Sequence, residues 1–343
     1  MKSNSILLIG NYLSKHGYNP TSIEHLKIEL SKKYNIKFAS DKKNFILRFL
    51  DSIFIILKNI NKCKLIIFDV FSTKAFILSV FIVLIAKYYK VPYVPVFRGG
   101  NLNNKYKQHP KLFKYLFDNA KTIICPSQYL AHHFCKLKSP IKVIPNYIVL
   151  NDIEFKFRSK LRPNLLWVRS IHKIYNPEMA INVLNNLKKK YTDAKLCMVG
   201  PIKDKSIKSL RNLIDKFQLG NSVLFKGKLS KIDWYEISKS YDIFINTTNY
   251  DNQPISVIES MALGLPIIST NAGGIEKLIV DNKTGFVIEK NDIIGMTNKV
   301  LRLLDGSIKF KEISLNARKE VESFDVNNVI LLWDKLIYNI INE

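Results

Sequence analysis

The sequence has no apolar run long enough to cross a membrane. Its longest, Ala75–Ala86, has 12 residues, whereas a membrane-spanning helix needs about 20. A helix buried against a sheet is expected there, with a helix at a membrane edge as the alternative. The first apolar run, Ile6–Ile9, ends in Gly-Asn and not in a cleavage site, so no signal peptide is expected.

Cysteine is scarce as well. The four cysteines form no CxxC pair, and their spacings fit no zinc site. Each lies among apolar residues, where cysteine behaves as a small hydrophobic side chain. The six histidines are scattered along the chain, so no metal is expected, and a reducing cytoplasm is the simplest setting. The cysteines are Cys63, Cys125, Cys135 and Cys197.

Acidic residues are few: 28 of them face 53 basic residues, which gives a formal net charge of +25. Residues 1–155 hold 24 basic and 8 acidic residues, and residues 156–343 hold 29 and 20. This basic first half favours an anionic partner such as a membrane surface or a phosphorylated substrate, and a Lys- and Asn-rich coding bias is the alternative. Because no helix-turn-helix, RNP or zinc-finger motif is present, no nucleic-acid partner is expected.

Short apolar runs alternate with longer segments of helical period, which is typical of parallel α/β sheets. The alternation restarts after the polar stretch Asn151–Pro163, where a linker is predicted. We therefore expect an α/β fold of two Rossmann-like, doubly wound domains facing a cleft. Their expected ranges are 1–155 and 156–324, with a helix over about 325–343 packing back on the first. The expected strands are Ser5–Ile9, Lys64–Phe68, Tyr93–Phe97, Thr122–Cys125, Lys142–Ile144, Leu165–Arg169, Lys195–Val199, Val223–Lys226, Ile243–Asn246, Pro266–Ser269 and Gly285–Ile288.

The stretch 241–275, YDIFINTTNYDNQPISVIESMALGLPIISTNAGGI, predicts a strand, a loop, a helix, a strand and a tight loop. Ser256 and Glu259 have the spacing of a capping box, and Gly264 suits the end of the helix. The free N–H groups at the start of this helix, together with its dipole, favour phosphate binding. The loop Asn271–Gly274 has no bulky side chains, so a phosphate can approach its backbone. Neither a Walker motif nor a GxGxxG is present.

This segment resembles the donor-site signature of family-4 glycosyltransferases, which have the GT-B fold. Asp251 and Glu259 stand in the family's relation of two acids with seven residues between, followed by Gly264-Leu265-Pro266. The family's first acid is usually Glu, and its glycine-rich link between the acids is here NQPIS. The resemblance implies that Glu259 binds ribose hydroxyls and that Asp251 contacts the transferred sugar. It assigns the phosphates to the backbone N–H groups of Ile255, Ser256 and Val257. Gln253 belongs to the same donor-binding set, as does Gly200.

A second motif, LLWVRSIHKIYNPEMAI, agrees with the first. Family members carry an Arg at the end of the strand and a Lys five residues later. Arg169 matches the Arg, whereas Ile174 holds the expected Lys position and Lys173 lies one residue earlier. The resemblance implies a catalytic set of Arg169, Lys173 and Asp251. The two basic residues would stabilise the leaving diphosphate. Gly200, directly after the strand KLCMV, resembles the family's glycine under the nucleotide.

The first half is expected to bind the acceptor. Arg98, Gly99, Gly100 and Asn101 directly follow a predicted strand, and Gly10 opens the loop after the first strand. Many relatives have His at the place of Arg98. Arginine cannot act as a base at neutral pH, so Arg98 is expected to bind a phosphate or hydroxyl groups.

The resemblance implies a retaining glycosyltransferase that moves a hexose-type sugar from a nucleotide-sugar to a saccharide or a lipid-diphosphate-linked saccharide. The expected pathway is O-antigen, capsule or exopolysaccharide synthesis, in the cytoplasm or on the inner face of the plasma membrane. Neither a cofactor nor a metal is expected, because helix N-termini and basic side chains neutralise the diphosphate. The alternatives are a sugar-nucleotide 2-epimerase of the same fold, a basic nucleic-acid-binding protein and a non-catalytic scaffold.

Overall fold

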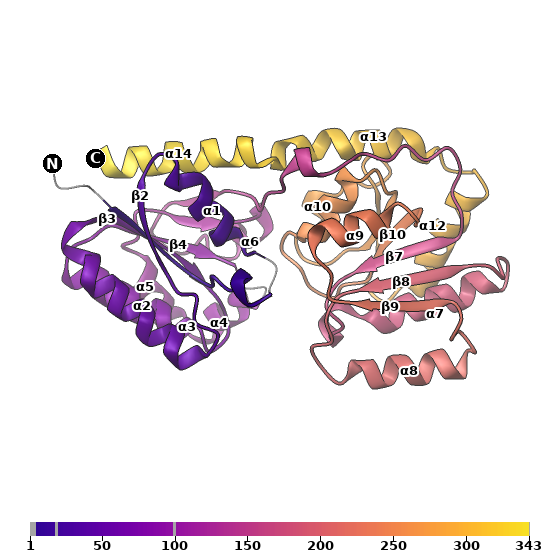
Figure 1. Cartoon of the computed structure of the whole chain (residues 1–343), viewed down its shortest axis with the longest axis horizontal. Helices are drawn as coiled ribbons and strands as arrows, with labels where there is room; N and C mark the ends of the chain where they lie inside the picture. The colour runs from indigo at the N-terminus through magenta and orange to yellow at the C-terminus, as the bar shows by residue number, and fades with distance from the viewer. Residues whose placement is uncertain (1–4, 18–19, 99–100, 343) are drawn as a thin grey trace. The chain divides into compact units, whose positions relative to one another are not determined.

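The chain folds into two compact units, each built around one parallel sheet. The computed structural model describes residues 5–17, 20–98 and 101–342. The first unit is formed by Met1–Tyr147 together with Val326–Glu343, and the second by Ile148–Asp325 (Figure 1). Both sheets have six strands, all paired in parallel. The two Rossmann-like domains predicted from the sequence are thereby confirmed.

The first sheet has the strand order β2-β1-β3-β4-β5-β6. Its side chains alternate between two apolar layers, as the period of two residues in a strand requires. Ile6 and Leu8 of β1 join the layer that contains Trp333, whereas Leu7 and Ile9 join the layer that contains Ile56. The strands are β1 (Ser5–Ile9), β2 (Asn35–Ala39), β3 (Cys63–Val70), β4 (Tyr93–Phe97), β5 (Ile123–Cys125) and β6 (Ile141–Val143).

Helices cover both faces of this sheet. One face carries α1 (Ser22–Ser31) and α14 (Val326–Asn342), as the shared apolar layer shows. Within α14 the buried side chains recur at helical spacing, and Asp334 on its flank forms an ion pair of 2.6 Å with Lys33. The other face carries α2 (Phe45–Asn59), α3 (Phe76–Tyr88), α4 (Leu102–Gln108), α5 (Pro110–Phe117) and α6 (Gln128–His132).

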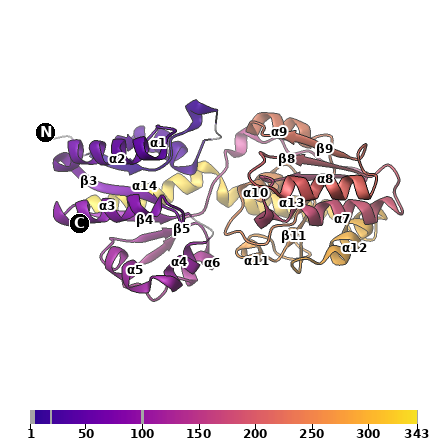
Figure 2. The same cartoon turned by 90° about the horizontal axis from the view of Figure 1, so that it is seen from below.

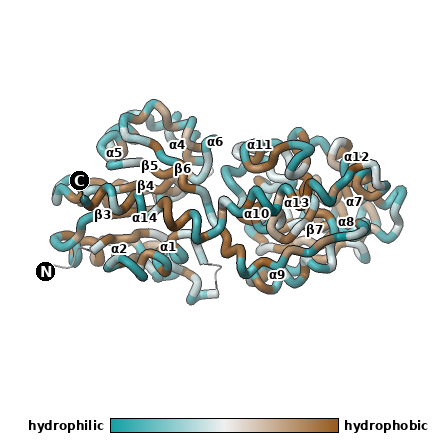
Figure 3. Tube along the Cα trace, turned by 90° about the horizontal axis from the view of Figure 1, so that it is seen from above, coloured by the Kyte–Doolittle hydropathy of each residue, from teal (hydrophilic) through white to brown (hydrophobic). Residues whose placement is uncertain are grey.

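The second sheet has the order β12-β11-β10-β7-β8-β9, and Figure 2 shows its helices from below. The strands are β7 (Asn164–Val168), β8 (Lys195–Val199), β9 (Val223–Gly227), β10 (Ile243–Asn246), β11 (Ile267–Thr270) and β12 (Phe286–Ile288). One face packs on α7 (Pro177–Lys188), α8 (Ser206–Lys216) and α12 (Ile293–Leu304). The other packs on α9 (Lys231–Ser238), α10 (Ile255–Ala262), α11 (Ile275–Leu278) and α13 (Phe310–Glu320). Hydrophobic segments alternate with hydrophilic ones along both units (Figure 3).

Each sheet has a point where the chain reverses its direction of winding. In the second sheet the chain starts at β7, runs outward through β8 and β9, and returns to β10 on the other side of β7. In the first sheet the reversal lies between β1 and β3. Ligands of doubly wound folds bind at the carboxyl ends of the strands beside such a reversal. The expected ligand-binding positions are therefore the residues after β7 and β10, and those after β1 and β3.

The first unit ends at Tyr147, before the expected boundary at 155, and the predicted linker 151–163 is part of the second unit. Ile153 and Leu161 are buried in that unit. Arg158 is buried as well, because main-chain carbonyls surround its guanidinium group. A stretch rich in charged residues is thus a packed element here, since its charges have partners.

β2 was not predicted from the sequence, because this edge strand is only partly buried. Cys63, Cys125 and Cys197 are buried as expected, but Cys135 is exposed. In the part of the chain that the structure describes, no helix has both the length and the apolar character needed to cross a bilayer.

Candidate active site

Two predicted site residues meet at the reversal point of the second sheet. Arg169 directly follows β7, and Asp251 lies in the loop after β10. Because β7 and β10 are neighbours, the two loops leave the same edge of the sheet, and Nη2 of Arg169 forms an ion pair with Oδ2 of Asp251. The Arg169 guanidinium carbon lies 4.9 Å from the centre of the Tyr175 ring. These side chains remain partly accessible, with exposed fractions of 15% for Arg169 and 16% for Asp251.

Hydrogen bonds tie the loop after β7 to the loop after β10. The indole N–H of Trp167 donates to Oγ1 of Thr247 at 2.9 Å, and that hydroxyl donates to the carbonyl of Tyr175 at 2.9 Å. The N–H of Asn249 donates to the carbonyl of Ile174 at 2.8 Å. The loop that carries Arg169 and the loop that carries Asp251 are therefore joined directly to each other by these hydrogen bonds.

Gly200 lies beneath Arg169. A Cβ atom on Gly200 would lie 1.9 Å from the carbonyl oxygen of Arg169, and the φ angle of Gly200 is +146°. The N–H of Arg169 donates to the carbonyl of Val199 at 2.9 Å, so the two strand ends run in close contact. Only glycine allows this approach. The structure thus gives Gly200, which was predicted as a donor-binding residue, a supporting position under Arg169.

Replacing Gly200 with alanine is expected to lower the free energy of unfolding by about 1–3 kcal/mol, because the added methyl group strains the backbone. Chemical denaturation measures this change. Gly220→Ala is the matched control, since nothing lies within 4 Å of a Cβ atom at Gly220. Equal stabilities of the two variants would contradict the supporting position of Gly200.

The predicted capping box at the start of α10 is wrong. The helix begins at Ile255 with Pro254 as its N-cap, so Ser256 is already inside the first turn. The carbonyl of Pro254 accepts the N–H groups of Val257 at 3.1 Å and Ile258 at 3.3 Å. The Glu259 side chain points elsewhere, so it does not reach back to the N-cap.

This start leaves part of the predicted phosphate site in place. The N–H of Val257 is occupied by Pro254, whereas within residues 5–17, 20–98 and 101–342 those of Ile255 and Ser256 have no partner. The hydroxyl oxygen of Ser256 is buried and also lacks a partner there. The loop 271–274 packs against the same region, because the N–H of Gly274 donates to the carbonyl of Asp251 at 2.8 Å.

The Glu259 side chain is buried, and one of its two carboxylate oxygens has polar partners. Its Oε1 accepts a hydrogen bond of 2.8 Å from the Tyr235 hydroxyl and lies 2.9 Å from Nζ of Lys231. Burial, and then the Glu259 carboxylate, raise the pKa of Tyr235 well above its usual range, so Tyr235 stays protonated and donates. Oε2 of Glu259 accepts no hydrogen bond from any described residue. This oxygen can accept hydroxyl groups of a ligand.

Lys173, the third residue of the predicted catalytic set, does not join the ion pair of Arg169 and Asp251. Lys173 is exposed, and its N–H donates to Oδ2 of Asp204 at 2.9 Å. No ion pair of its side chain is found in the described part of the chain. Gln253 is buried in the same loop as Asp251. The structure therefore brings Arg169 and Asp251 together, but not Lys173.

In the first unit, Arg98 follows β4 and pairs with Asp69 of β3. Nε of Arg98 lies 3.0 Å from Oδ1 of Asp69, and its Nη1 donates to Oδ1 of Asn146 at 2.9 Å. Burial raises the pKa of the Asp69 carboxyl, and the charge of Arg98 opposes this rise. Gly10 lies beside this pair, because a Cβ atom there would be 3.0 Å from Oδ2 of Asp69.

The remaining acceptor-site predictions are not joined to this pair. Asn101 is exposed, and its Oδ1 accepts a hydrogen bond of 2.6 Å from the side chain of Asn104. Gly99 and Gly100 lie outside the described residues.

Several partners of the predicted residues were missed in the sequence. Lys231 and Tyr235 carry no signature of their own, since their contacts with Glu259 join distant parts of the chain. Tyr175 lies close to Arg169 in the sequence, but no motif marks it as a partner of that residue. Asp69 did carry a signal: it is a lone acid inside the apolar run LIIFDV, and a buried charge needs a partner.

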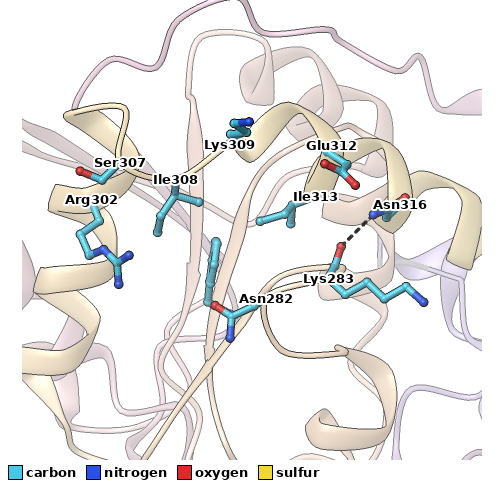
Figure 4. Close-up of a pocket in the computed structure, with 10 residues that line it drawn as sticks. Asn282, Lys283, Arg302, Ser307, Ile308, Lys309, Glu312, Ile313 and Asn316 are labelled. Atoms are coloured by element: carbon cyan, nitrogen blue, oxygen red, sulfur yellow. Dashed lines mark hydrogen bonds between the residues drawn. The ribbon is translucent and has the colours of Figure 1, made fainter.

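A cavity of about 320 Å³ in the second unit lies away from these residues. It is formed by the turn before β12, the end of α12 and the start of α13, and Figure 4 shows polar side chains such as Asn282 and Glu312 beside the apolar Ile308 and Ile313. The residues predicted for the donor site are not among those that line it.

Residues 151–320 match the family of glycosyl transferases group 1. The match lies within the second unit, and the chain as a whole has the two Rossmann-like domains of the GT-B fold. The chain is 26% identical over 193 residues to the capsular polysaccharide biosynthesis glycosyltransferase CapM of Staphylococcus aureus, which covers 55% of this chain and 50% of CapM. The chain thus spans only half the length of this curated relative.

Solved structures share the fold over nearly the whole chain. Sucrose-phosphate synthase from Thermosynechococcus elongatus has a TM-score of 0.82 at 13% identity, covering 98% of each chain. HepE from Anabaena, solved in complex with UDP-glucose, has a TM-score of 0.75 at 15% identity, covering 98% of this chain and 99% of HepE. At such identities the likeness shows the fold alone.

Proposed function

We propose that the protein is a retaining, family-4 type glycosyltransferase that moves a hexose-type sugar from a nucleotide-sugar to a saccharide or lipid-diphosphate-linked saccharide. The observation that carries the proposal is the pair of Arg169 and Asp251 at the reversal point of a sheet whose sequence matches group 1 glycosyl transferases. The complex of HepE with UDP-glucose supports a nucleotide-sugar donor.

Arg169 is assigned to the leaving diphosphate. Breaking the bond between sugar and phosphate builds negative charge on the nucleotide, and preorganised donors stabilise this charge by roughly 3 kcal/mol each. Arginine has five N–H donors, and the ion pair with Asp251 occupies those of Nη2 alone. The free N–H groups of Ile255 and Ser256 are further donors, and Lys173 adds positive charge on a flexible side chain.

The two carboxylates are assigned to hydroxyl groups. Oε2 of Glu259 is open while Oε1 is fixed by Tyr235 and Lys231, so the carboxylate has one preset orientation for binding the ribose. Asp251 is partly exposed and is assigned to the transferred sugar. In the retaining mechanism that the family resemblance implies, the leaving phosphate helps to deprotonate the acceptor, so no protein nucleophile is required.

The acceptor is assigned to the first unit. The guanidinium of Arg98 is oriented by Asp69 and Asn146, and it suits a phosphate or a hydroxyl-rich group. The similarity to CapM supports a role in capsule or another surface polysaccharide. An acceptor carried on a lipid diphosphate would place the reaction at the inner face of the plasma membrane.

Binding of the cognate nucleotide is expected to stabilise the protein, and Glu259→Ala is expected to weaken this effect. At about one hundred times its dissociation constant, a ligand adds about 2.7 kcal/mol to the free energy of unfolding. Thermal unfolding with UDP, GDP, CMP and their sugar conjugates measures the shift. The control is Glu236→Ala on α9, whose side chain is 70% exposed. If no nucleotide shifts the melting temperature of the wild type, the proposed function fails.

A further inference from the structure

Two neighbouring helices of the first unit expose apolar side chains. The exposed positions of α3 follow one stripe of the helix, at spacings of four, three and four residues. Those of α2 lie along one side of that helix in the same way. We call these nine side chains the apolar face: Ile46, Leu47, Leu50, Phe54, Leu57, Ile77, Phe81, Leu84 and Tyr88.

The apolar face is one continuous surface. The rings of Phe49 on α2 and Phe81 on α3 lie 5.2 Å apart, edge to face, and Figures 1 and 2 show the two helices side by side. The opposite sides of the helices, with Ile56 and Val83, are fully buried against the sheet. Both helices are therefore apolar on both sides, whereas a helix between a core and water normally has a polar outer side.

Large exposed apolar patches mark interaction sites, whereas single exposed apolar residues are ordinary. The sequence prediction of a buried helix at Ala75–Ala86 is thus only half correct. The inner side of α3 is buried, as predicted, but its outer side is exposed, which leaves the alternative of a helix at a membrane edge open.

Lysines flank the apolar face at both ends of the two helices. They are exposed, and we call them the basic rim: Lys42, Lys43, Lys58, Lys74 and Lys90. The acids of this stretch have partners of their own. Asp69 pairs with Arg98, Asp51 with Ser40, and Asp41 with Lys15 and, at 3.7 Å, with Lys42. The surface thus combines apolar contact area with positive charge.

We propose that the apolar face inserts into the interface of an anionic bilayer, with the basic rim at the level of the lipid headgroups. This inference deepens the proposed function, on which it rests for the lipid-linked acceptor. An apolar helix side rich in Phe and Leu and flanked by Lys is typical of helices that lie in a membrane interface, and each lysine near an anionic surface adds attraction. A second copy of this chain fits less well, because its basic rim would face like charges.

Co-sedimentation with vesicles of phosphatidylcholine, with or without phosphatidylglycerol, tests the inference on the full chain. The wild type is expected to bind the vesicles that contain phosphatidylglycerol. The triple variant Leu50→Ser, Phe54→Ser, Leu84→Ser should bind these vesicles at least about tenfold more weakly, because it removes apolar area from the membrane contact. The matched control is Ile232→Ser, Ile294→Ser, Leu331→Ser, which removes three exposed apolar side chains from α9, α12 and α14 and should bind like the wild type.

The outcomes are distinguishable. Equal binding of the two triple variants, or no binding by the wild type at low salt, overturns the inference. It is also overturned if the wild type is a dimer in analytical ultracentrifugation and the first triple variant is a monomer, because a second copy then covers the apolar face. An unchanged melting temperature shows that the variants are folded. If vesicles bind as expected but no nucleotide stabilises the protein, the proposed function fails while the membrane contact stands.

Discussion

Replacing Arg169 with alanine is expected to lower turnover about a hundredfold, because the leaving diphosphate loses a preorganised donor. The guanidinium is fixed by the ion pair with Asp251 and by its position over the Tyr175 ring. Lys173 is not fixed in this way, since its side chain is solvent-exposed and forms no ion pair with a described residue. The loss should appear in kcat more than in KM, because the charge develops in the transition state.

Turnover is measured as nucleotide release from whichever nucleotide-sugar stabilises the wild type. Arg211→Ala, an exposed arginine on α8, is the control and should be fully active. Arg169→Lys should recover part of the lost rate, because lysine keeps the charge but loses the planar fork. Near-normal turnover of Arg169→Ala would remove this residue from the mechanism.

Replacing Arg158 with alanine is expected to destabilise the second unit by about 3–5 kcal/mol, since it leaves buried polar groups without their partner. Arg158 is 4% exposed and forms an ion pair of 3.5 Å with Asp242. Burial lowers the pKa of Arg158 to about 10, although the charge of Asp242 opposes this shift. Its guanidinium also donates to main-chain carbonyls of Lys156, Ser238, Tyr241, Leu263 and Gly264.

Arg162→Ala is the matched control for this variant. Arg162 also pairs with Asp242, at 2.7 Å, but its side chain is 56% exposed. Its loss should therefore cost at most about 1 kcal/mol. Urea denaturation followed by tryptophan fluorescence suits the comparison, because Trp167 and Trp234 belong to the second unit. Equal losses in the two variants would show that burial of Arg158 contributes nothing.

The sheets could be predicted because parallel strands covered on both faces are continuous apolar runs. β2 could not be predicted because this edge strand buries too few side chains to form such an apolar run. The boundary at Tyr147 could not be predicted either, since the charges of Arg158 and its neighbours read as solvent-exposed. The carbonyls that accept hydrogen bonds from Arg158 include some about eighty to a hundred residues away. The local sequence around Arg158 does not reveal such partners.

The candidate site shows the same division. The spacing of Asp251 and Glu259 and the position of Arg169 were readable as motifs, and the structure brings Arg169 and Asp251 into contact. The start of α10 was predicted wrongly because the spacing of Ser256 and Glu259 fits a capping box, although Pro254 is the N-cap in the structure. Pro254 decides the matter, since its carbonyl accepts the first helical hydrogen bonds. The roles of all the predicted site residues, Lys173, Gln253 and Asn101 among them, remain predictions.

The first unit is discontinuous in the chain, and this has a consequence for synthesis. Its apolar layer under β1 is closed by Val329, Trp333 and Ile337 of α14. The ribosome makes these residues only after the whole of Ile148–Asp325. Domains generally fold as they emerge, so the second unit can be complete while the first still exposes one side of its sheet. The N-terminal half of the nascent chain is therefore the part that needs protection from aggregation for longest.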